Sequence, residues 1–203
     1  MDKKREDRRT VCSKKAIRES LLALMEEKPL NKITVREICE KADVNRSTFY
    51  AYYMDIYDLH RAILKEYFRY QHRIISECKS ILGSRPDITA LTVADFADFY
   101  LVYFSIVLDN KELYRYVFNQ NSSAAIHVNM RKLFYRELVR LLPAETPEKI
   151  REAFFASFIF VSGGVTFLIM EWLNNGCRMP AETLARRAAY FSNGVFNGYH
   201  ANP

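Results

Sequence analysis

The side chains with the clearest chemistry lie close together near the amino-terminal end of the chain. Arg46 can bind a guanine edge or a phosphate with two hydrogen bonds, and the small donors Ser47 and Thr48 permit close approach. The phenolic hydroxyl groups of Tyr50 and Tyr52 can donate to phosphate oxygens. This combination suits the recognition of double-stranded DNA.

A helix is predicted directly before these residues. Thr34 and Glu37 have the spacing of a capping box, in which each side chain binds the backbone of the other residue. The helix is predicted to end near Ala42. Its amino end presents N–H groups that can bind a phosphate, so Thr34 and Arg36 are predicted contacts.

A second, shorter helix is predicted to carry these candidate DNA-binding residues. Asp43 and Val44 make a tight turn, and Asn45 is predicted to cap a helix over residues 46–53. A helix-turn-helix places the amino end of its second helix in the major groove, although plain α-hairpins share this geometry. The outward set is Arg46, Ser47, Thr48 and Tyr50, with Phe49 and Tyr53 directed inward. The candidate DNA contacts are Thr34, Arg36, Asn45, Arg46, Ser47, Thr48, Tyr50 and Tyr52.

The rest of the chain shows helical and no strand periodicity. A first helix is predicted to begin between Thr10 and Ser13 and to end near Lys28, and a fourth runs from Asp55 to about Leu82. Five more are predicted over residues 89–108, 110–119, 122–142, 147–175 and 180–199. The predicted fold is all-α with about nine helices: a three-helix DNA-binding head (residues 1–54) and a larger helical body for dimerisation and ligand binding (residues 55–203).

Composition favours a polyanionic partner over catalysis. The chain has 203 residues and a net charge of +6, and residues 1–18 hold eight Lys or Arg residues against three acidic ones. A solvated tail would show the same charge run. The dispersed side chains that could catalyse or bind metal are His60, His72, His127, His200, Cys12, Cys39, Cys78 and Cys177. We therefore expect no enzyme, metal or cofactor, and a reducing cytoplasmic setting.

One uncharged stretch, residues 153–170, reaches the length of a membrane span. A helix buried between subunits explains it better, because charged residues lie close on both sides, so we expect no membrane. Each glycine inside a helix costs about 1 kcal/mol relative to alanine, and a glycine pair persists where another backbone comes close. Gly163 and Gly164 are such a pair, inside the helix predicted over residues 147–175.

Aromatic side chains crowd the predicted body. Core packing explains any one of them, while polar-tipped aromatics together would suit a largely apolar ligand pocket. The candidate ligand contacts are Tyr100, Tyr103, Phe104, Phe118, His127, Phe134 and Phe158.

Residues 10–65, and above all the run ITVREICEKADVNRSTFYAYY at residues 33–53, closely resemble the DNA-binding head of the TetR/AcrR family of bacterial regulators. The resemblance implies a three-helix head, a fourth helix that links it to the body, homodimers and, usually, repression relieved by a ligand. It also implies that the last two helices, here residues 147–175 and 180–199, form a four-helix bundle across the dimer. The candidate dimer contacts within residues 147–199 are therefore Gly163, Gly164, Phe167 and Phe191. By position it implies base contacts from Arg46, Ser47, Thr48 and Tyr50, with phosphate contacts from Thr34 and Tyr52.

The chain departs from the family pattern at two positions. Asp43 stands where the turn usually has Gly, and Asp tolerates a left-handed backbone better than most residues. Ile56 stands where many members have a Lys that contacts phosphate, and the basic segment at residues 9–18 is a candidate replacement. Residues 158–176 look like the C-terminal region of a subgroup that includes regulators of dihydroxyacetone utilisation.

The resemblance and the residues together predict a homodimeric repressor that binds a palindromic operator. A small-molecule effector, whose identity the sequence does not give, would release it. The alternative is a DNA-binding activator or co-regulator whose body docks another protein.

Overall fold

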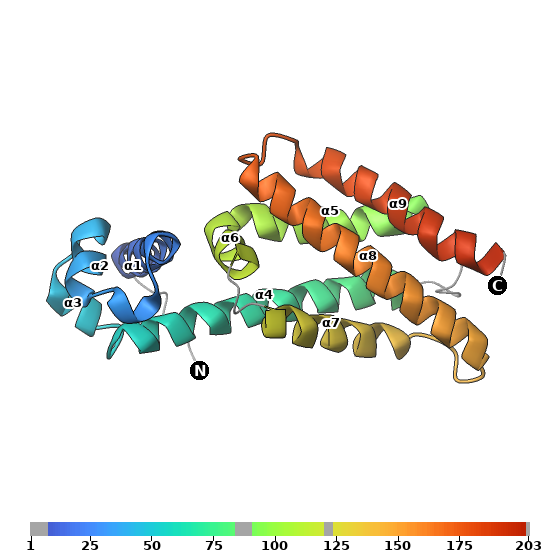
Figure 1. Cartoon of the computed structure of the whole chain (residues 1–203), viewed down its shortest axis with the longest axis horizontal. Coiled ribbons are helices and arrows are strands. Elements are labelled where there is room, and N and C mark those ends of the chain that lie inside the picture. The colour runs from blue at the N-terminus through green and yellow to red at the C-terminus, as the bar shows by residue number, and fades with distance from the viewer. Residues whose placement is uncertain (1–7, 84–90, 120–123, 202–203) are drawn as a thin grey trace. The chain divides into compact units, whose positions relative to one another are not determined.

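The computed structural model describes residues 8–83, 91–119 and 124–201, and these contain nine α-helices, one 3-10 helix and no strand (Figure 1). The all-α prediction is confirmed. The chain divides into two compact units, Met1–Phe68 with Glu112–Tyr116, and Arg69–Lys111 with Val117–Pro203. The predicted division after residue 54 remains a proposal about the DNA-binding segment, since the first compact unit extends to Phe68.

The first unit is built on helices that surround a small apolar core. Its elements are α1 (Arg8–Glu27), η1 (Leu30–Lys32), α2 (Val35–Ala42), α3 (Arg46–Tyr50), the first part of α4 (Ile56–Gly83) and part of α6 (Lys111–Asn119). Ile17 and Leu21 of α1 are fully buried, as are Ile38, Phe49 and Leu59 from the three helices that follow. Burial of one apolar stripe per helix holds α2 against α1 and α3 against α2.

Local backbone chemistry sets both ends of α2. The Thr34 hydroxyl accepts from the Glu37 N–H, and a Glu37 carboxylate oxygen accepts from the Thr34 N–H at 2.9 Å, so the predicted capping box is confirmed. Asp43 ends the helix in a left-handed conformation (φ 53°, ψ 49°), and its N–H donates to the carbonyls of Cys39 and Glu40. The turn therefore forms with Asp, as predicted.

The next helix is shorter than predicted. α3 is helical over Arg46–Tyr50 only, and a turn follows. Asn45 occupies the capping position with extended backbone, but its side chain makes no capping hydrogen bond, so this part of the prediction is wrong. Asp55 does cap α4, because its Oδ1 accepts from the Asp58 N–H at 2.7 Å.

The second unit consists of longer helices. They are α5 (Val93–Asp109), α7 (Ala124–Val139), α8 (Glu148–Asn174) and α9 (Ala181–Ala201), with the remaining parts of α4 and α6. α5 packs along α9, and α8 forms an antiparallel pair with α9 (Figure 1). Thr92 and Asp95 form a second capping box at the start of α5, which the sequence analysis missed although the T-x-x-D spacing is present. Gly176 ends α8 with a positive φ of 69°.

Candidate nucleic-acid interface

The amino end of α3 protrudes from the first unit. Arg46 and Ser47 are exposed, Thr48 is half-buried, and Tyr50 is 58% exposed. Phe49, between them, is fully buried and anchors the helix. The predicted inward position of Phe49 and outward positions of Arg46, Ser47 and Tyr50 are confirmed, and Thr48 is only partly outward.

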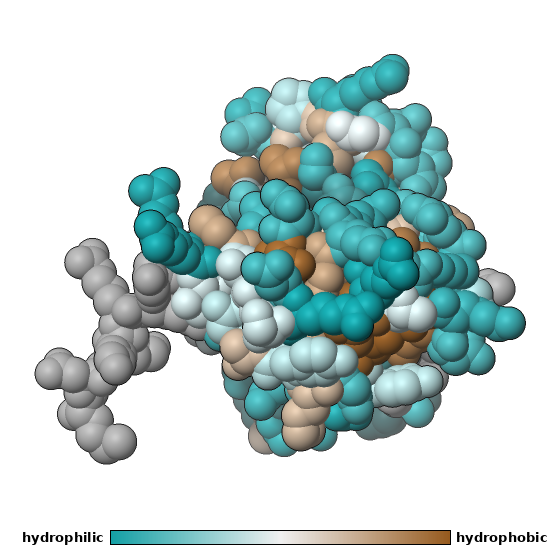
Figure 2. Space-filling view, turned by 90° about the vertical axis from the view of Figure 1, so that its left-hand side faces the viewer, coloured by the Kyte–Doolittle hydropathy of each residue, from teal (hydrophilic) through white to brown (hydrophobic). Residues whose placement is uncertain are grey.

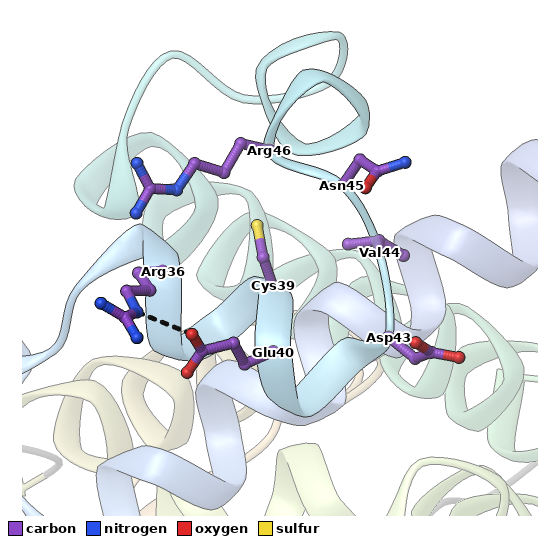
Figure 3. Close-up of a pocket in the computed structure, with 7 residues that line it drawn as sticks. All are labelled: Arg36, Cys39, Glu40, Asp43, Val44, Asn45 and Arg46. Atoms are coloured by element: carbon purple, nitrogen blue, oxygen red, sulfur yellow. Dashed lines mark hydrogen bonds and ion pairs between the residues drawn. The ribbon is translucent and has the colours of Figure 1, made fainter.

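A polar hollow of about 490 Å³ lies between α2 and α3. It is lined by Arg36, Cys39, Glu40, Asp43, Val44, Asn45 and Arg46. In Figure 3 the guanidinium groups of Arg36 and Arg46 point to one side of the hollow, and the side chains of Asp43 and Asn45 point to the other. Figure 2, which faces the side where α2 and α3 lie in Figure 1, shows a largely hydrophilic surface. Three of the candidate contacts (Arg36, Asn45 and Arg46) therefore share one concave surface.

Glu40 lines this hollow and was not among the candidate contacts, although it pairs with one of them. Its Oε1 accepts a hydrogen bond from Arg36 Nε at 2.7 Å, and this bond and the negative charge of Glu40 raise the pKa of Arg36. The signal was available, since Arg and Glu four residues apart on a helix are neighbours.

The hydroxyl of Thr34 is already engaged. It donates to Glu37 Oε2 at 2.8 Å and accepts from the Glu37 N–H at 3.3 Å. Hydrogen bonds from Lys28 and Thr34 lower the pKa of Glu37 to about 2, so its carboxylate is charged at the amino end of α2. A phosphate here would have to use the N–H groups of Val35 and Arg36, which have no partner inside the helix. The phosphate contact stays a prediction.

Tyr52 contacts α1. Its hydroxyl lies 3.5 Å from Thr10 Oγ1, and Lys14 Nζ lies 5.2 Å from the centre of its ring. Neither Thr10 nor Lys14 was named as a candidate contact by itself, although both lie in the basic segment at residues 9–18 that was a candidate replacement for a phosphate contact. The structure thus places a lysine beside the tyrosine that is predicted to contact phosphate.

The candidate ligand residues largely form an aromatic core within the second unit. Tyr100, Phe104, Phe118 and Phe158 are buried, and Tyr103 and Phe134 are half-buried. Their ring centres lie 5.6 Å apart for Tyr100 and Phe104 and 6.3 Å apart for Phe134 and Phe158. The side chain of His127 lies outside the described residues. Ligand contact remains a prediction for the whole set, since packing accounts for the burial.

The candidate dimer residues lie on α8 and α9, two helices that expose several large aromatic side chains. We call the exposed aromatic positions of these two helices the α8–α9 face, and the most exposed of them are Phe160 (71%), Phe167 (72%), Tyr190 (70%) and Phe191 (63%). A Cβ added at Gly163 or Gly164 would meet no atom of the described chain within 4 Å. In the described ranges α8 alone is long and apolar enough to span a membrane, which by itself is weak evidence for a span. Exposed apolar side chains of this kind are typical of interaction sites, and the dimer contact stays a prediction.

No metal centre is found among the described side chains. They include no group of three His, Cys, Asp or Glu residues able to hold a metal ion. The four cysteines form no disulfide bond with one another, and Cys39 and Cys78 are buried. Burial raises the pKa of both thiols, which keeps them protonated.

Comparison with known proteins places both parts of the chain among regulators. Residues 17–63 match the family model described as bacterial regulatory proteins, tetR family, and residues 95–194 match one described as transcriptional regulator C-terminal region. The uncharacterised HTH-type transcriptional regulator YxbF of Bacillus subtilis is 26% identical over 122 residues, which are 56% of this chain. The match spans 32% of that relative's length.

Two solved structures have a similar fold. One is the fatty acid degradation regulator FadR from Bacillus halodurans, with a TM-score of 0.59 and 13% identity over 90% of this chain and 95% of that one. The other is a Clostridium perfringens protein described as a fatty acid metabolism regulator, with a TM-score of 0.54 and 13% identity over 90% and 97% of the two chains. At this identity the similarity concerns the fold alone.

Proposed function

The chain belongs to the tetR family of bacterial transcriptional regulators, and from this premise we propose that it is a homodimeric repressor that leaves a palindromic operator when a small-molecule effector binds. The observation that carries the proposal is the exposed amino end of α3. There Arg46 and Ser47 protrude while Phe49, two residues on from Ser47, is buried. An arginine in this position can bind guanine O6 and N7 with two hydrogen bonds.

Most of the proposed contacts fall into two groups. Base contacts are assigned to the residues around the amino end of α3, and backbone contacts to the residues that flank them. The proposed base contacts are Arg46, Ser47, Thr48 and Tyr50, and the proposed backbone contacts are Thr34 and Tyr52. Arg36 and Asn45 are proposed to contact DNA without assignment to either group. Thr48 is half-buried, so only part of its side chain can touch a base. The hydroxyl of Thr34 already binds Glu37, so it must share that bond to contact a phosphate.

Dimerisation is assigned to the α8–α9 face. Its four exposed aromatic side chains would leave water if two copies packed this face together, and burial of apolar area is the main driving force for association. A twofold dimer would place two recognition helices about one duplex turn apart, roughly 34–36 Å, on a palindrome.

The effector is assigned to the aromatic core of the second unit. A ligand that binds one spacing of the two heads better than the other would shift the population toward that spacing. Repression relieved in this way needs only a difference in affinity between the two states. A regulator of this kind acts where the DNA is, so we propose a cytoplasmic location.

A gel-shift experiment tests the proposal. The probes are duplexes from upstream of the chain's own gene and of its neighbours, titrated with wild type, Arg46→Ala and Arg140→Ala. Arg140 is an exposed arginine of the second unit and controls for the loss of one charge. We expect Arg46→Ala to weaken binding to the preferred duplex about tenfold or more, since one bidentate base contact discriminates by roughly 1–3 kcal/mol.

Salt gives a second readout of the same complex. Contacts with about six to ten phosphates would reduce affinity by roughly 10³-fold or more between 50 and 200 mM salt. Equal binding by wild type and Arg46→Ala on every duplex, or an affinity that hardly changes with salt, would reject the assignment of α3 as the recognition helix.

A further inference from the structure

Glu40 places a negative charge on the surface that is proposed to face DNA. Its side chain lines the same hollow as Arg36 and Arg46 (Figure 3). The side chains of Arg36 and Glu40 are 70% and 60% exposed, so the pair is open to solvent and to a duplex. A carboxylate that approaches phosphates weakens binding through like-charge repulsion. On a surface that faces DNA, such a residue would weaken binding even without touching the duplex.

The hydrogen bond from Arg36 to Glu40 uses only one part of the guanidinium group. Nε donates to Oε1 at 2.7 Å, while the guanidinium has five N–H donors in a rigid fork. The four donors on Nη1 and Nη2 form the edge that binds a guanine or a phosphate with two parallel bonds. A guanidinium that is already held by a hydrogen bond at Nε also loses less rotational freedom when it binds DNA.

Resting on the proposed function, we propose that Glu40 is a positioning residue for DNA recognition: it holds Arg36 at Nε, presents the outer guanidinium edge to the duplex and so increases discrimination between target and non-target DNA. On its target, Arg36 meets its acceptor in the prepared orientation. On other sequences, Arg36 must leave Glu40 to reach a phosphate, and the released carboxylate repels the backbone.

The proposal makes a signed prediction for Glu40→Gln. The amide keeps the size of the side chain but removes the charge, so Arg36 is held less firmly and the repulsion disappears. Affinity for non-target DNA should rise about threefold or more. The slope of log affinity against log salt concentration should steepen by roughly one, because Arg36 is then free to neutralise one more phosphate. The ratio of target to non-target affinity should fall about fivefold or more.

The experiment uses the full chain and DNA of defined origin. A preferred duplex is selected with wild type from a pool with a randomised centre, and a shuffled duplex of the same composition serves as non-target DNA. Both are titrated with wild type, Glu40→Gln, Arg36→Ala, the double variant, and Glu19→Gln. Glu19 is the matched control, because it is an exposed acid of the same compact unit, paired with Lys15 at 3.7 Å on α1.

The result expected is a loss of discrimination that depends on Arg36. Glu40→Gln should lower the ratio in the wild-type background and leave it unchanged in the Arg36→Ala background, while Glu19→Gln leaves it within about twofold. Unaltered melting temperatures would show that the variants are folded. Two outcomes would overturn the role of Glu40. One is an unchanged ratio of target to non-target affinity in Glu40→Gln, and the other is an equal fall of this ratio in the Arg36→Ala background. Failure of wild type to select any duplex would instead reject the proposed function, and this inference with it.

Discussion

At the scale of single residues, Asp43 holds a backbone conformation that most side chains avoid. Its φ of 53° and ψ of 49° lie in the left-handed region, where Asp is tolerated and Gly carries no steric cost. We expect Asp43→Gly to raise the free energy of unfolding by up to about 1 kcal/mol and Asp43→Val to lower it. Urea unfolding of the three proteins measures both changes. A less stable Asp43→Gly variant would mean that the carboxylate itself stabilises the turn.

Glu37 couples the stability of the first unit to pH. Its pKa is lowered from 4.5 to about 2 by hydrogen bonds from Lys28 and Thr34. A depressed pKa in the folded state stabilises the fold above the unfolded-state pKa, and this contribution is lost as the pH falls from 4.5 through about 2.

The Glu37→Gln variant tests this coupling. It lacks the titrating group, so we expect its melting temperature to lie below that of wild type near neutral pH, and the gap to close as the pH falls below about 4. Thr34→Ser keeps the capping hydroxyl and should follow wild type. A gap of constant size at every pH would contradict the coupling.

At the scale of helices, the sequence predicts those features that depend on residues close together in the chain. The capping box of Thr34 and Glu37 involves neighbouring residues only, and the burial of Phe49 follows from helical spacing, so both could be predicted from the sequence. The contact of Lys14 in α1 with Tyr52 in the turn after α3 joins residues 38 positions apart, and no periodicity predicts it. Asn45 is a good capping residue by type, yet its side chain does not cap.

Within the second unit, α5 and α9 share a buried polar contact. The hydroxyl groups of Tyr100 and Ser192 lie 2.7 Å apart, and both side chains are at least 97% buried. Tyr100→Phe would leave the Ser192 hydroxyl without this partner, at a cost of about 1–3 kcal/mol in the free energy of unfolding. Adding Ser192→Ala should recover part of the loss, because both polar groups are then gone.

A double-mutant cycle in urea separates the two outcomes. A coupling energy near zero would mean that the hydroxyl pair contributes nothing to stability, and would leave the hydroxyl of Tyr100 available as a candidate ligand contact. A clear coupling supports a structural role for Tyr100 and directs the search for a ligand to the half-buried Tyr103 and Phe134.

At the scale of the whole molecule, the paired glycines of α8 have no explanation inside one chain. An added Cβ at Gly163 or Gly164 meets no described atom within 4 Å, so packing within the chain does not require glycine there. Alanine at either site should therefore favour the helix by about 1 kcal/mol. If a second copy packs here, the same substitution should weaken the dimer. An alanine variant that stabilises the chain but weakens dimer affinity would indicate that the two subunits approach closely at these glycines.

Phe167 gives the sharpest test of the dimer. It is 72% exposed on the α8–α9 face, where a glutamate would stay hydrated in the monomer but bury a charge in the proposed dimer. We expect Phe167→Glu to be monomeric by analytical ultracentrifugation while it retains its helical circular dichroism. Because two linked heads bind about 10²–10⁴ times more tightly than one, its affinity for a palindromic duplex should fall at least about 100-fold. Leu101→Glu, at a 37% exposed apolar position on α5, is the control and should remain dimeric. A dimeric Phe167→Glu with wild-type DNA affinity would place the subunit contact elsewhere.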